Sequence, residues 1–365
     1  MSIYRRLVYF SAVLTLIVLV VGAYVRLSDA GLGCPDWPGC YGQLTPAHAT
    51  QQIDAAVQAQ GGDHGPVSIP KAWKEMGHRY LAGVLGLCIL AIAVVAWLQR
   101  RHTSIRLPIV MLVLLGVQAT LGMWTVTLLL KPAIVTAHLL GGMSLLALLV
   151  WLSTEQWLAV QITAQTKIQT PSPSPSPSPS PSQSTVHGVP GVRRLASVAL
   201  GVVIVQIALG GWVSTNYAAL ACPDLPLCRG HVVPPMDFAN AFHVLRELGQ
   251  TAQGAWLSVE ALTAIHWTHR MFAVLVFFVV GGLAHRLARV ANCRGLARGL
   301  AVLLLAQIAI GLGNVVLSLP LWLAAAHNAG AALLLSILIV INCRLYAMRT
   351  LQAVGPTVPS AVSAS

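Results

Sequence analysis

Eight long apolar stretches, each almost free of charged residues, leave this 365-residue chain few ways to fold in water. About 20 such residues in a helix cross the hydrocarbon core of a bilayer, whereas barrel strands are shorter and alternate in polarity. Only 9% of the residues are charged, compared with about 25% in soluble domains. We therefore predict an all-α, multi-pass membrane protein with eight spans, at residues 7–26, 79–98, 107–128, 134–155, 195–214, 267–285, 299–318 and 323–343.

Lysine and arginine side chains set the predicted orientation, because the cytoplasmic loops of membrane proteins carry an excess of both. With the N-terminus on the cytoplasmic side, 14 of the 22 basic residues fall inside, and 8 fall outside or at the outer edge. An even number of spans then returns the C-terminus to the cytoplasm. The net charge of +12 reflects this bias, and because no soluble basic domain accompanies it, we expect no nucleic-acid partner.

Several motifs occur twice at a nearly constant separation, which indicates an internal duplication. The separation is 188 to 191 residues, and the matched residues are Cys34 with Cys222, His78 with His269, Gln118 with Gln307, and His138 with His327. Each half contains four spans, so both halves insert in the same direction. We predict a parallel repeat of two four-helix bundles, related by a pseudo-two-fold axis along the membrane normal.

The duplication and a low-complexity Pro/Ser run divide the chain into predicted parts. A Pro/Ser sequence cannot pack a core and favours an extended spacer, so we assign it to a linker between the halves. The predicted boundaries are 1–165 for the N-terminal half with its outer loop at 27–77, 166–192 for the cytoplasmic linker, 193–346 for the C-terminal half with its outer loop at 215–265, and 347–365 for a disordered tail.

Two pairs of histidines are the main candidates for function. His78 and His269 fall at the outer ends of the second and sixth spans, and His138 and His327 fall just inside the outer ends of the fourth and eighth. A single membrane histidine is explained as well by an interhelical hydrogen bond as by function, but matched pairs at equal depth favour function. Two facing imidazoles suit haem iron, whereas zinc needs three or four clustered ligands. We predict one b-type haem site in each half, toward the outer face.

Arg79 and Arg270 directly follow the first histidine of each pair. We expect both side chains near the outer interface, where haem propionates would lie. Two roles are equally open for them, which are contact with propionates and extension to lipid headgroups.

A carboxylate distinguishes the two halves. Glu75 precedes His78 by three residues, so on a helix the two side chains share a face one turn apart. The residue that matches Glu75 in the second half is His266. Glu75 could simply favour a helix N-terminus, but its presence in one half only indicates a reaction site in the first half and an electron-transfer site in the second.

Two cysteine pairs lie in the predicted outer loops, where an oxidising compartment allows disulfides. They are Cys34 with Cys40 and Cys222 with Cys228. A structural role is the simpler interpretation, and we favour it for the second pair. The first pair follows the Gly-Leu-Gly sequence at 31–33, next to the predicted reaction site, so a redox or substrate-handling role stays open.

The strings RLSDAGLGCPDWPGCYGQ and EMGHR, the TAH and AAH histidines and the duplication resemble the heme A synthase family, over all eight spans. This resemblance implies oxidation of a haem O methyl group to a formyl group, which yields haem A, through hydroxylation steps and loss of water. It implies that His78 and His138 flank haem O, that His269 and His327 ligate haem b, and that Glu75 is the catalytic carboxylate. It also implies outer-loop cysteine pairs and a place in the bacterial inner membrane.

The expected partners are the lipid bilayer, a haem O synthase as substrate donor, terminal oxidase assembly and an unidentified electron donor, with homo-oligomerisation left open. The main alternative is a bis-histidine di-haem cytochrome b that carries electrons from quinol to an outside acceptor. A thiol-disulfide exchanger would leave the four histidines unexplained. A haem exporter would need an alternating pathway that two sites near one membrane face do not suggest.

Overall fold

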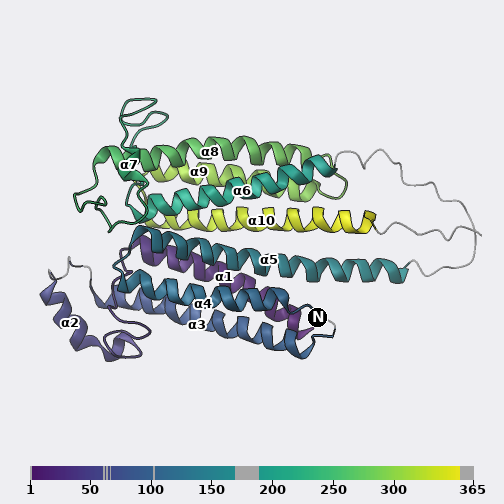
Figure 1. Cartoon of the computed structure of the whole chain (residues 1–365), viewed down its shortest axis with the longest axis horizontal. Helices are drawn as coiled ribbons and strands as arrows, with labels where there is room; N and C mark the ends of the chain where they lie inside the picture. Colours follow the sequence, from purple (N-terminus) through teal and green to yellow (C-terminus); the bar gives the residue numbers. More distant parts are fainter. Residues whose placement is uncertain are drawn as a thin grey trace, which may run out of the picture.

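The computed structural model describes residues 2–60, 62, 65, 67–101, 103–168 and 189–353 (Figure 1). Eight of its helices are long and apolar enough to cross a membrane, which confirms the predicted all-α class and the eight spans. The elements are α1 (Ile3–Leu27), η1 (Pro46–His48), α2 (Thr50–Ala59), α3 (Ile69–Leu98), α4 (Arg106–Thr127), α5 (Pro132–Ile168), α6 (Val189–Thr215), α7 (Phe238–Ala241), α8 (Val259–Leu287), α9 (Arg294–Val316) and α10 (Leu321–Ala353).

Two helices begin well before the predicted spans. α3 begins at Ile69 rather than at residue 79, and α8 begins at Val259 rather than at residue 267. The hydroxyl groups of Ser68 and Ser258 cap these helices by accepting a backbone N–H three residues later. The added turns contain charged residues, such as Lys71 and Lys74 in α3 and Glu260 in α8, so a hydropathy criterion places the start of each span too late.

The connection between the halves and the C-terminal tail fall mostly outside the described residues. Within the predicted linker, 166–192, α5 continues to Ile168 and α6 begins at Val189. Residues 169–188 and 354–365 are not described. α10 continues to Ala353, so the first residues of the predicted tail are helical.

The long helices form two four-helix groups that lie side by side (Figure 1). The first contains α1, α3, α4 and α5, and the second contains α6, α8, α9 and α10. Helices α5 and α10 lie at the centre, where α10 packs on α1 and α5, and α5 packs on α6. Because α6 corresponds to α1 and α10 to α5, these contacts are the ones that a two-fold axis between the repeats would produce.

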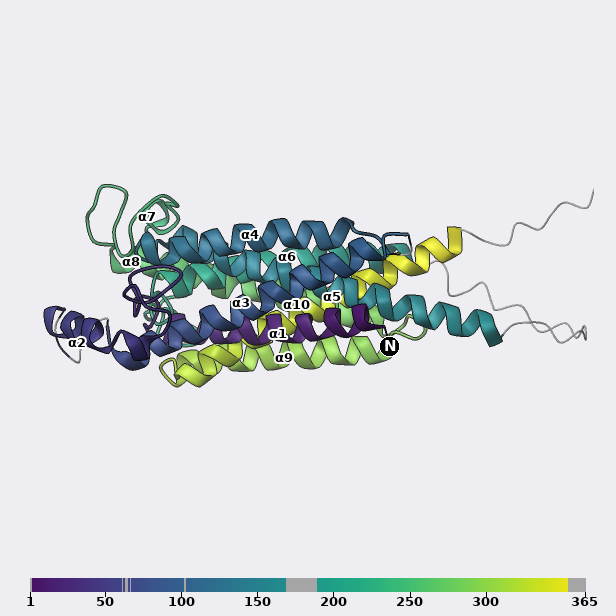
Figure 2. The same ribbon diagram turned by 90° about the horizontal axis from the view of Figure 1, so that it is seen from below.

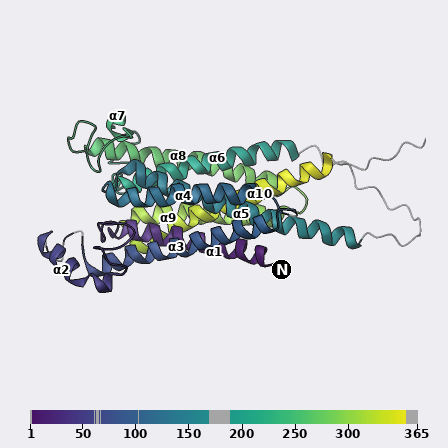
Figure 3. The ribbon, with the colours of Figure 1, turned by 60° about the horizontal axis from the view of Figure 1, so that its bottom comes forward.

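One end of the molecule carries the cysteine motifs. We call it the loop end, and it consists of the described residues within 28–68 and 216–258, including α2 and α7 (Figure 2). The N-terminus lies at the opposite end of the bundles in each view (Figures 2 and 3). The histidines of both pairs lie toward the loop end of their helices.

Arg26 of α1 joins the two halves at the loop end. Its Nη2 atom donates to the carbonyl oxygens of Ser214, at 3.0 Å, and Thr215, at 3.4 Å, which are the last residues of α6. Its guanidinium group lies over the ring of Tyr217, 4.2 Å from the centroid. A cation is favourable there because the last carbonyl groups of a helix have no helical partner.

A second polar contact between the halves is the ion pair of Lys131 with Glu247, whose atoms are 2.7 Å apart. Apolar packing continues the same interface inside the bundles. One buried cluster combines Leu19 of α1 and Met143 and Leu146 of α5 with residues of the four long helices of the second half. The two halves therefore share a core and do not merely touch at the loops.

Candidate functional site

The four candidate histidines form two pairs, one within each bundle. His78 of α3 lies near His138 of α5, and His269 of α8 lies near His327 of α10. His78 and His269 lie more than two turns inside their helices, not at the ends as the predicted spans implied. The fold thus brings together the same histidines that were predicted to pair because they lie at equal depth in the membrane.

Each histidine ring lies against a glycine of a neighbouring helix. A Cβ atom on Gly22 would approach His78 Cε1 to 2.8 Å, and one on Gly210 would approach His269 Cε1 to 3.1 Å. Gly122 and Gly311 contact the other two rings in the same way, at 3.2 and 3.0 Å. Any larger residue at these four positions would displace an imidazole, so the glycines keep the space around both pairs.

Glutamine side chains contact the histidines differently in the two halves. In the second half, Gln206 Nε2 lies 3.2 Å from His269 Nδ1, and Gln307 Nε2 donates to the carbonyl oxygen of His327 at 2.9 Å. In the first half, Gln118 matches Gln307, but Val18 occupies the position that matches Gln206. The second pair is therefore held by two amide side chains, whereas the Nε2 atom of Gln118 in the first half is buried without a hydrogen-bond partner among the described residues.

Unpaired nitrogen atoms indicate that the histidine pairs bind something further. The Nδ1 atoms of His78, His138 and His327 are buried and have no hydrogen-bond partner among the described residues. Buried polar atoms without a partner are uncommon in native folds and call for an additional group.

The residues of each pair fit haem. Among the described residues, no three His, Cys, Asp or Glu side chains cluster closely enough to hold a metal ion. A pair of imidazoles is instead sufficient for haem, because the porphyrin supplies the other four nitrogen ligands of its iron. His78 with His138, and His269 with His327, are the residues that would hold one haem each.

Glu75 is buried inside α3, with 4% of its surface exposed. Its Oε2 atom accepts the backbone N–H of Cys34 at 2.9 Å, and its Oε1 atom pairs with Arg79 Nη2 at 2.6 Å. Ser68 caps the helix seven residues earlier, so Glu75 does not serve the helix N-terminus, which was the alternative open from the sequence.

His266 has the same structural role in the second half. Its Nδ1 atom accepts the backbone N–H of Cys222 at 3.1 Å, and it is also 4% exposed. Glu75 and His266 therefore each anchor the first cysteine of a loop. His266 is engaged by this loop, whereas His269 lies with His327.

Arg79 and Arg270 hold the same two loops through their carbonyl groups. Arg79 Nη1 donates to the carbonyl oxygen of Asp36 at 2.8 Å, and Arg270 Nη1 donates to that of Asp224 at 2.9 Å. Further carbonyl contacts run from Arg79 to Gly39 and from Arg270 to Cys222 and Leu227. A contact of either arginine with a propionate stays a prediction, and it would have to coexist with these loop contacts.

Both predicted cysteine pairs are disulfide-bonded, with Cα–Cα distances of 4.8 Å for Cys34–Cys40 and 4.6 Å for Cys222–Cys228. An aspartate closes each loop by accepting two backbone N–H groups. Asp36 accepts from Tyr41 and Gly42, and Asp224 accepts from Arg229 and Gly230. The two loops thus have the same internal hydrogen bonds. They differ in the side chain that binds their first cysteine, which is Glu75 in the first half and His266 in the second.

Comparison with known proteins identifies the family. The family model described as cytochrome oxidase assembly protein, COX15-CtaA, matches residues 5–339. The chain belongs to the COX15-CtaA family.

Individual relatives carry a more specific name. A protein of Shewanella oneidensis named heme A synthase is 40% identical over 336 residues, covering 92% of this COX15-CtaA chain and 94% of the relative. Proteins of the same name from Methylorubrum populi and Methylobacterium radiotolerans are 30% and 28% identical, covering 93% and 91% of this chain and 86% and 87% of their own lengths. The family resemblance noted from the motifs is confirmed.

Some residues of the site in this COX15-CtaA protein were not singled out from the sequence. The loop-closing aspartates repeat within the shared Cys-Pro-Asp sequence, and the glycines beside the histidines repeat at 188 and 189 residues. These repeats could have indicated the aspartates and the glycines from the sequence. Gln206 has no counterpart in the first half, so no repeat could have indicated it.

Acid should weaken the second cysteine loop. The pKa of Asp224 lies below its usual 3.8, mainly because its carboxylate accepts the N–H of Gly230, and also because it accepts that of Arg229. A lowered folded-state pKa means that the stabilisation is complete above the unfolded-state pKa and is lost as pH falls through the folded-state value. We expect reduction of Cys222–Cys228 by a phosphine to be slow from neutral pH to about pH 4 and to accelerate below it.

The Asp224→Asn variant is the control for that measurement, because it lacks the carboxylate charge at every pH. Its disulfide should be reduced faster than the wild-type one at neutral pH, and it should lose the additional acceleration in acid. Equal reduction rates for the two proteins across the pH range would show that this carboxylate does not stabilise the loop.

Proposed function

We propose that this protein is a haem A synthase, an oxidoreductase that converts a methyl group of haem O to the formyl group of haem A. The observation that carries the proposal is the 40% identity to the Shewanella heme A synthase over 92% of the chain. The paired histidines agree with it, since such an enzyme needs a site for a haem substrate inside a membrane protein.

The first half is the proposed reaction site. His78 and His138 would hold haem O as the substrate, between α3 and α5. When bound, the iron supplies the oxidative chemistry, and the protein supplies orientation and proton transfer. The glycines that face the two rings leave the space that each imidazole occupies.

Glu75 is the proposed proton-transfer group. It lies one turn from His78 on the same helix, so its carboxylate would be near the edge of the bound ring. Each carboxylate oxygen has a lone pair beyond the one used by Cys34 or Arg79, so Glu75 could accept a proton released during oxidation of the methyl group, while the bound haem would supply the redox chemistry. The ion pair with Arg79 fixes the position of this carboxylate before the reaction.

The second half is the proposed electron-transfer site. His269 and His327 would hold a resident haem b, with Gln206 and Gln307 donating to the backbone carbonyl oxygens of these two histidines. A hydrogen bond to the second ring nitrogen or to the backbone of a ligand orients it toward the iron. The imidazole of His266 stands where the first half has a carboxylate, which suits a site that carries electrons without oxidising its own haem.

We place the enzyme in the bacterial inner membrane, with both termini in the cytoplasm and the loop end outside. Disulfides at the loop end and the arginine-rich turns at the other end support this orientation. Haem is poorly soluble, so we expect direct transfer from a haem O synthase and onward to a terminal oxidase during its assembly.

Identification of the bound pigments tests this function. The protein is purified from cells that make haem O, and its haems are extracted, separated and identified by mass. Haem b together with haem O or haem A is the expected result. Haem b alone, at two per chain, would instead establish the di-haem cytochrome b that is the alternative.

A further inference from the structure

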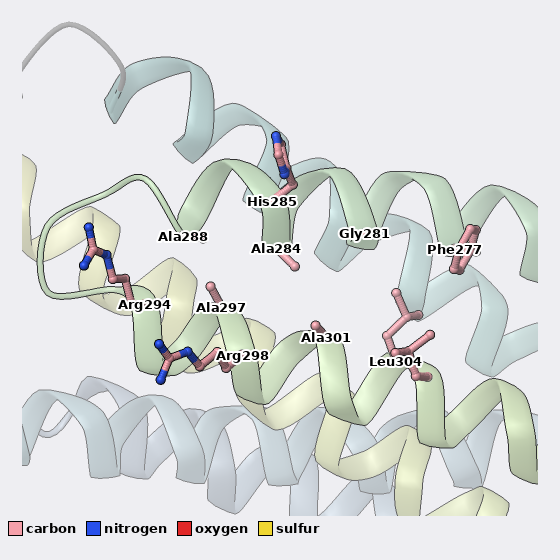
Figure 4. Close-up of a pocket in the computed structure, with 11 residues that line it drawn as sticks. Phe277, Gly281, Ala284, His285, Ala288, Arg294, Ala297, Arg298, Ala301 and Leu304 are labelled. Carbon is pink, nitrogen blue, oxygen red and sulfur yellow. The ribbon is translucent and has the colours of Figure 1, made fainter.

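A groove of about 540 Å³ opens between α8 and α9, at the end of the second bundle opposite to the loop end (Figure 4). Ala284 and Ala297 point toward each other across it, and Phe277 and Leu304 line the part deeper in the bundle. The volume lies within the range of about 300–1,000 Å³ typical of ligand sites. The walls are mainly apolar and could accept a hydrocarbon chain.

Basic side chains surround the other end of this groove. Arg294 is the first residue of α9, and Arg298 lies one turn later, and both line the groove (Figure 4). Across from them, His285 of α8 lies 2.9 Å from the guanidinium group of Arg289. The groove therefore has an apolar body and a cationic mouth.

The N-terminus of α9 adds to the positive potential at this mouth. No side chain caps it, and its first turn contains no acidic residue. Free N–H groups and the helix dipole at such an end favour a phosphate. Arg294 and Arg298 form no ion pair in the part of the chain that the structure describes.

The surrounding surface does not neutralise these cations. Of the ten acidic residues in the sequence, only Glu155 lies in or beside the segments assigned to the cytoplasmic side. Fourteen of the 22 basic residues lie there. An anionic ligand is therefore the complementary one.

The first half lacks the residues that make this groove, although it has the same fold. The counterparts, at the offsets that match the histidines and glutamines, are Leu90 for Gly281, Trp97 for Ala288, Ile109 for Arg298 and Leu112 for Ala301. At these positions larger apolar groups replace small ones, and an apolar group replaces a cation. At two other positions the change is reversed, since Gly86 matches Phe277 and Gly116 matches Leu305. The matching residues of the first half therefore do not reproduce the lining of this groove.

We infer that this groove binds one anionic phospholipid of the cytoplasmic leaflet. Its phosphate lies at Arg294, Arg298 and the N-terminus of α9, and one acyl chain lies along the small residues between the helices. Basic pockets between membrane helices on the cytoplasmic side bind anionic headgroups in this way. The inference rests on the proposed orientation and not on the haem chemistry, so either can fail without the other.

Native mass spectrometry of the full-length protein tests the inference. The purified protein is mixed with phosphatidylglycerol or with phosphatidylcholine of the same acyl composition. Wild-type protein should retain phosphatidylglycerol about tenfold more tightly, and the double variant Arg294→Gln, Arg298→Gln should retain both lipids equally. The variant Arg100→Gln, Arg101→Gln removes two arginines from the connection between α3 and α4 in the first half and should behave as wild type.

A second variant tests the apolar part of the groove. Gly281→Leu with Ala301→Leu introduces the residues found in the first half, and it should lower phosphatidylglycerol retention without changing the melting temperature greatly. Equal retention of the two lipids by wild-type protein would overturn the inference. It would also be overturned if both arginine variants lost the preference equally, or if a neutral molecule such as a quinone occupied the groove.

Discussion

Replacement of Glu75 by glutamine is expected to lower haem A formation by about 100- to 10,000-fold, the range typical of a lost general acid or base. Glutamine keeps an oxygen atom that can accept the Cys34 N–H, but it removes the charge that pairs with Arg79. The ratio of haem A to haem O is measured in haems extracted from membranes that contain the variant. Both haem sites should stay occupied.

The second half offers a matched control for that experiment. His266→Gln changes the corresponding loop anchor while leaving Glu75 in place, and it should retain most of the haem A yield. Destabilisation of the cysteine loop is checked in both variants by measuring how much protein is present in the membrane and whether both disulfides are oxidised. A normal haem A yield from Glu75→Gln would exclude the carboxylate from the chemistry.

Replacement of one histidine in either pair is expected to remove the haem that this pair binds and to leave the other haem in place. His327→Ala should reduce the bound haem b to below about a tenth of its wild-type amount, because loss of a ligand exceeds the roughly 10- to 100-fold effect of losing an outer partner. His138→Ala should instead release haem O and leave haem b in place. Haem content per protein is measured by absorbance after extraction, with each haem identified by mass.

The two variants test the division of labour between the halves. Loss of both haems from each variant would mean that the sites are interdependent or that the protein has unfolded, and thermal unfolding of the purified variants distinguishes these cases. Loss of haem O from His327→Ala with haem b retained would reverse the assignment of substrate and cofactor. Loss of both haems from folded variants, or the reversed pattern, would contradict the proposed roles.

The spans and the pairing of the histidines could be predicted from the sequence because both depend on local or repeated information. About 20 apolar residues need a bilayer-spanning helix whatever surrounds them. Equal depth and a constant repeat offset bring His78 to His138 and His269 to His327 without knowledge of helix packing. The starts of α3 and α8 could not be found in this way, because their first turns mix charged with apolar residues and pack against the loop end.

The anchoring of the loops could not be predicted either. Glu75 binds a backbone N–H that lies 41 residues earlier, and a backbone group carries no sequence signature. For the same reason, Arg79 looked equally suited to a propionate or a lipid headgroup, although its described partners are loop carbonyl groups. Contacts between a side chain and a distant backbone require the folded arrangement of helix and loop.

The shared anchor of the two loops also bears on how one gene duplication could produce two different sites. The fold needs only a hydrogen-bond acceptor at this position, and a carboxylate or an imidazole meets that need equally, as Glu75 and His266 do. A substitution between them would leave the disulfide loop in place while adding or removing an ionisable oxygen beside a haem. Divergence at this one residue is therefore compatible with an intact loop in either half.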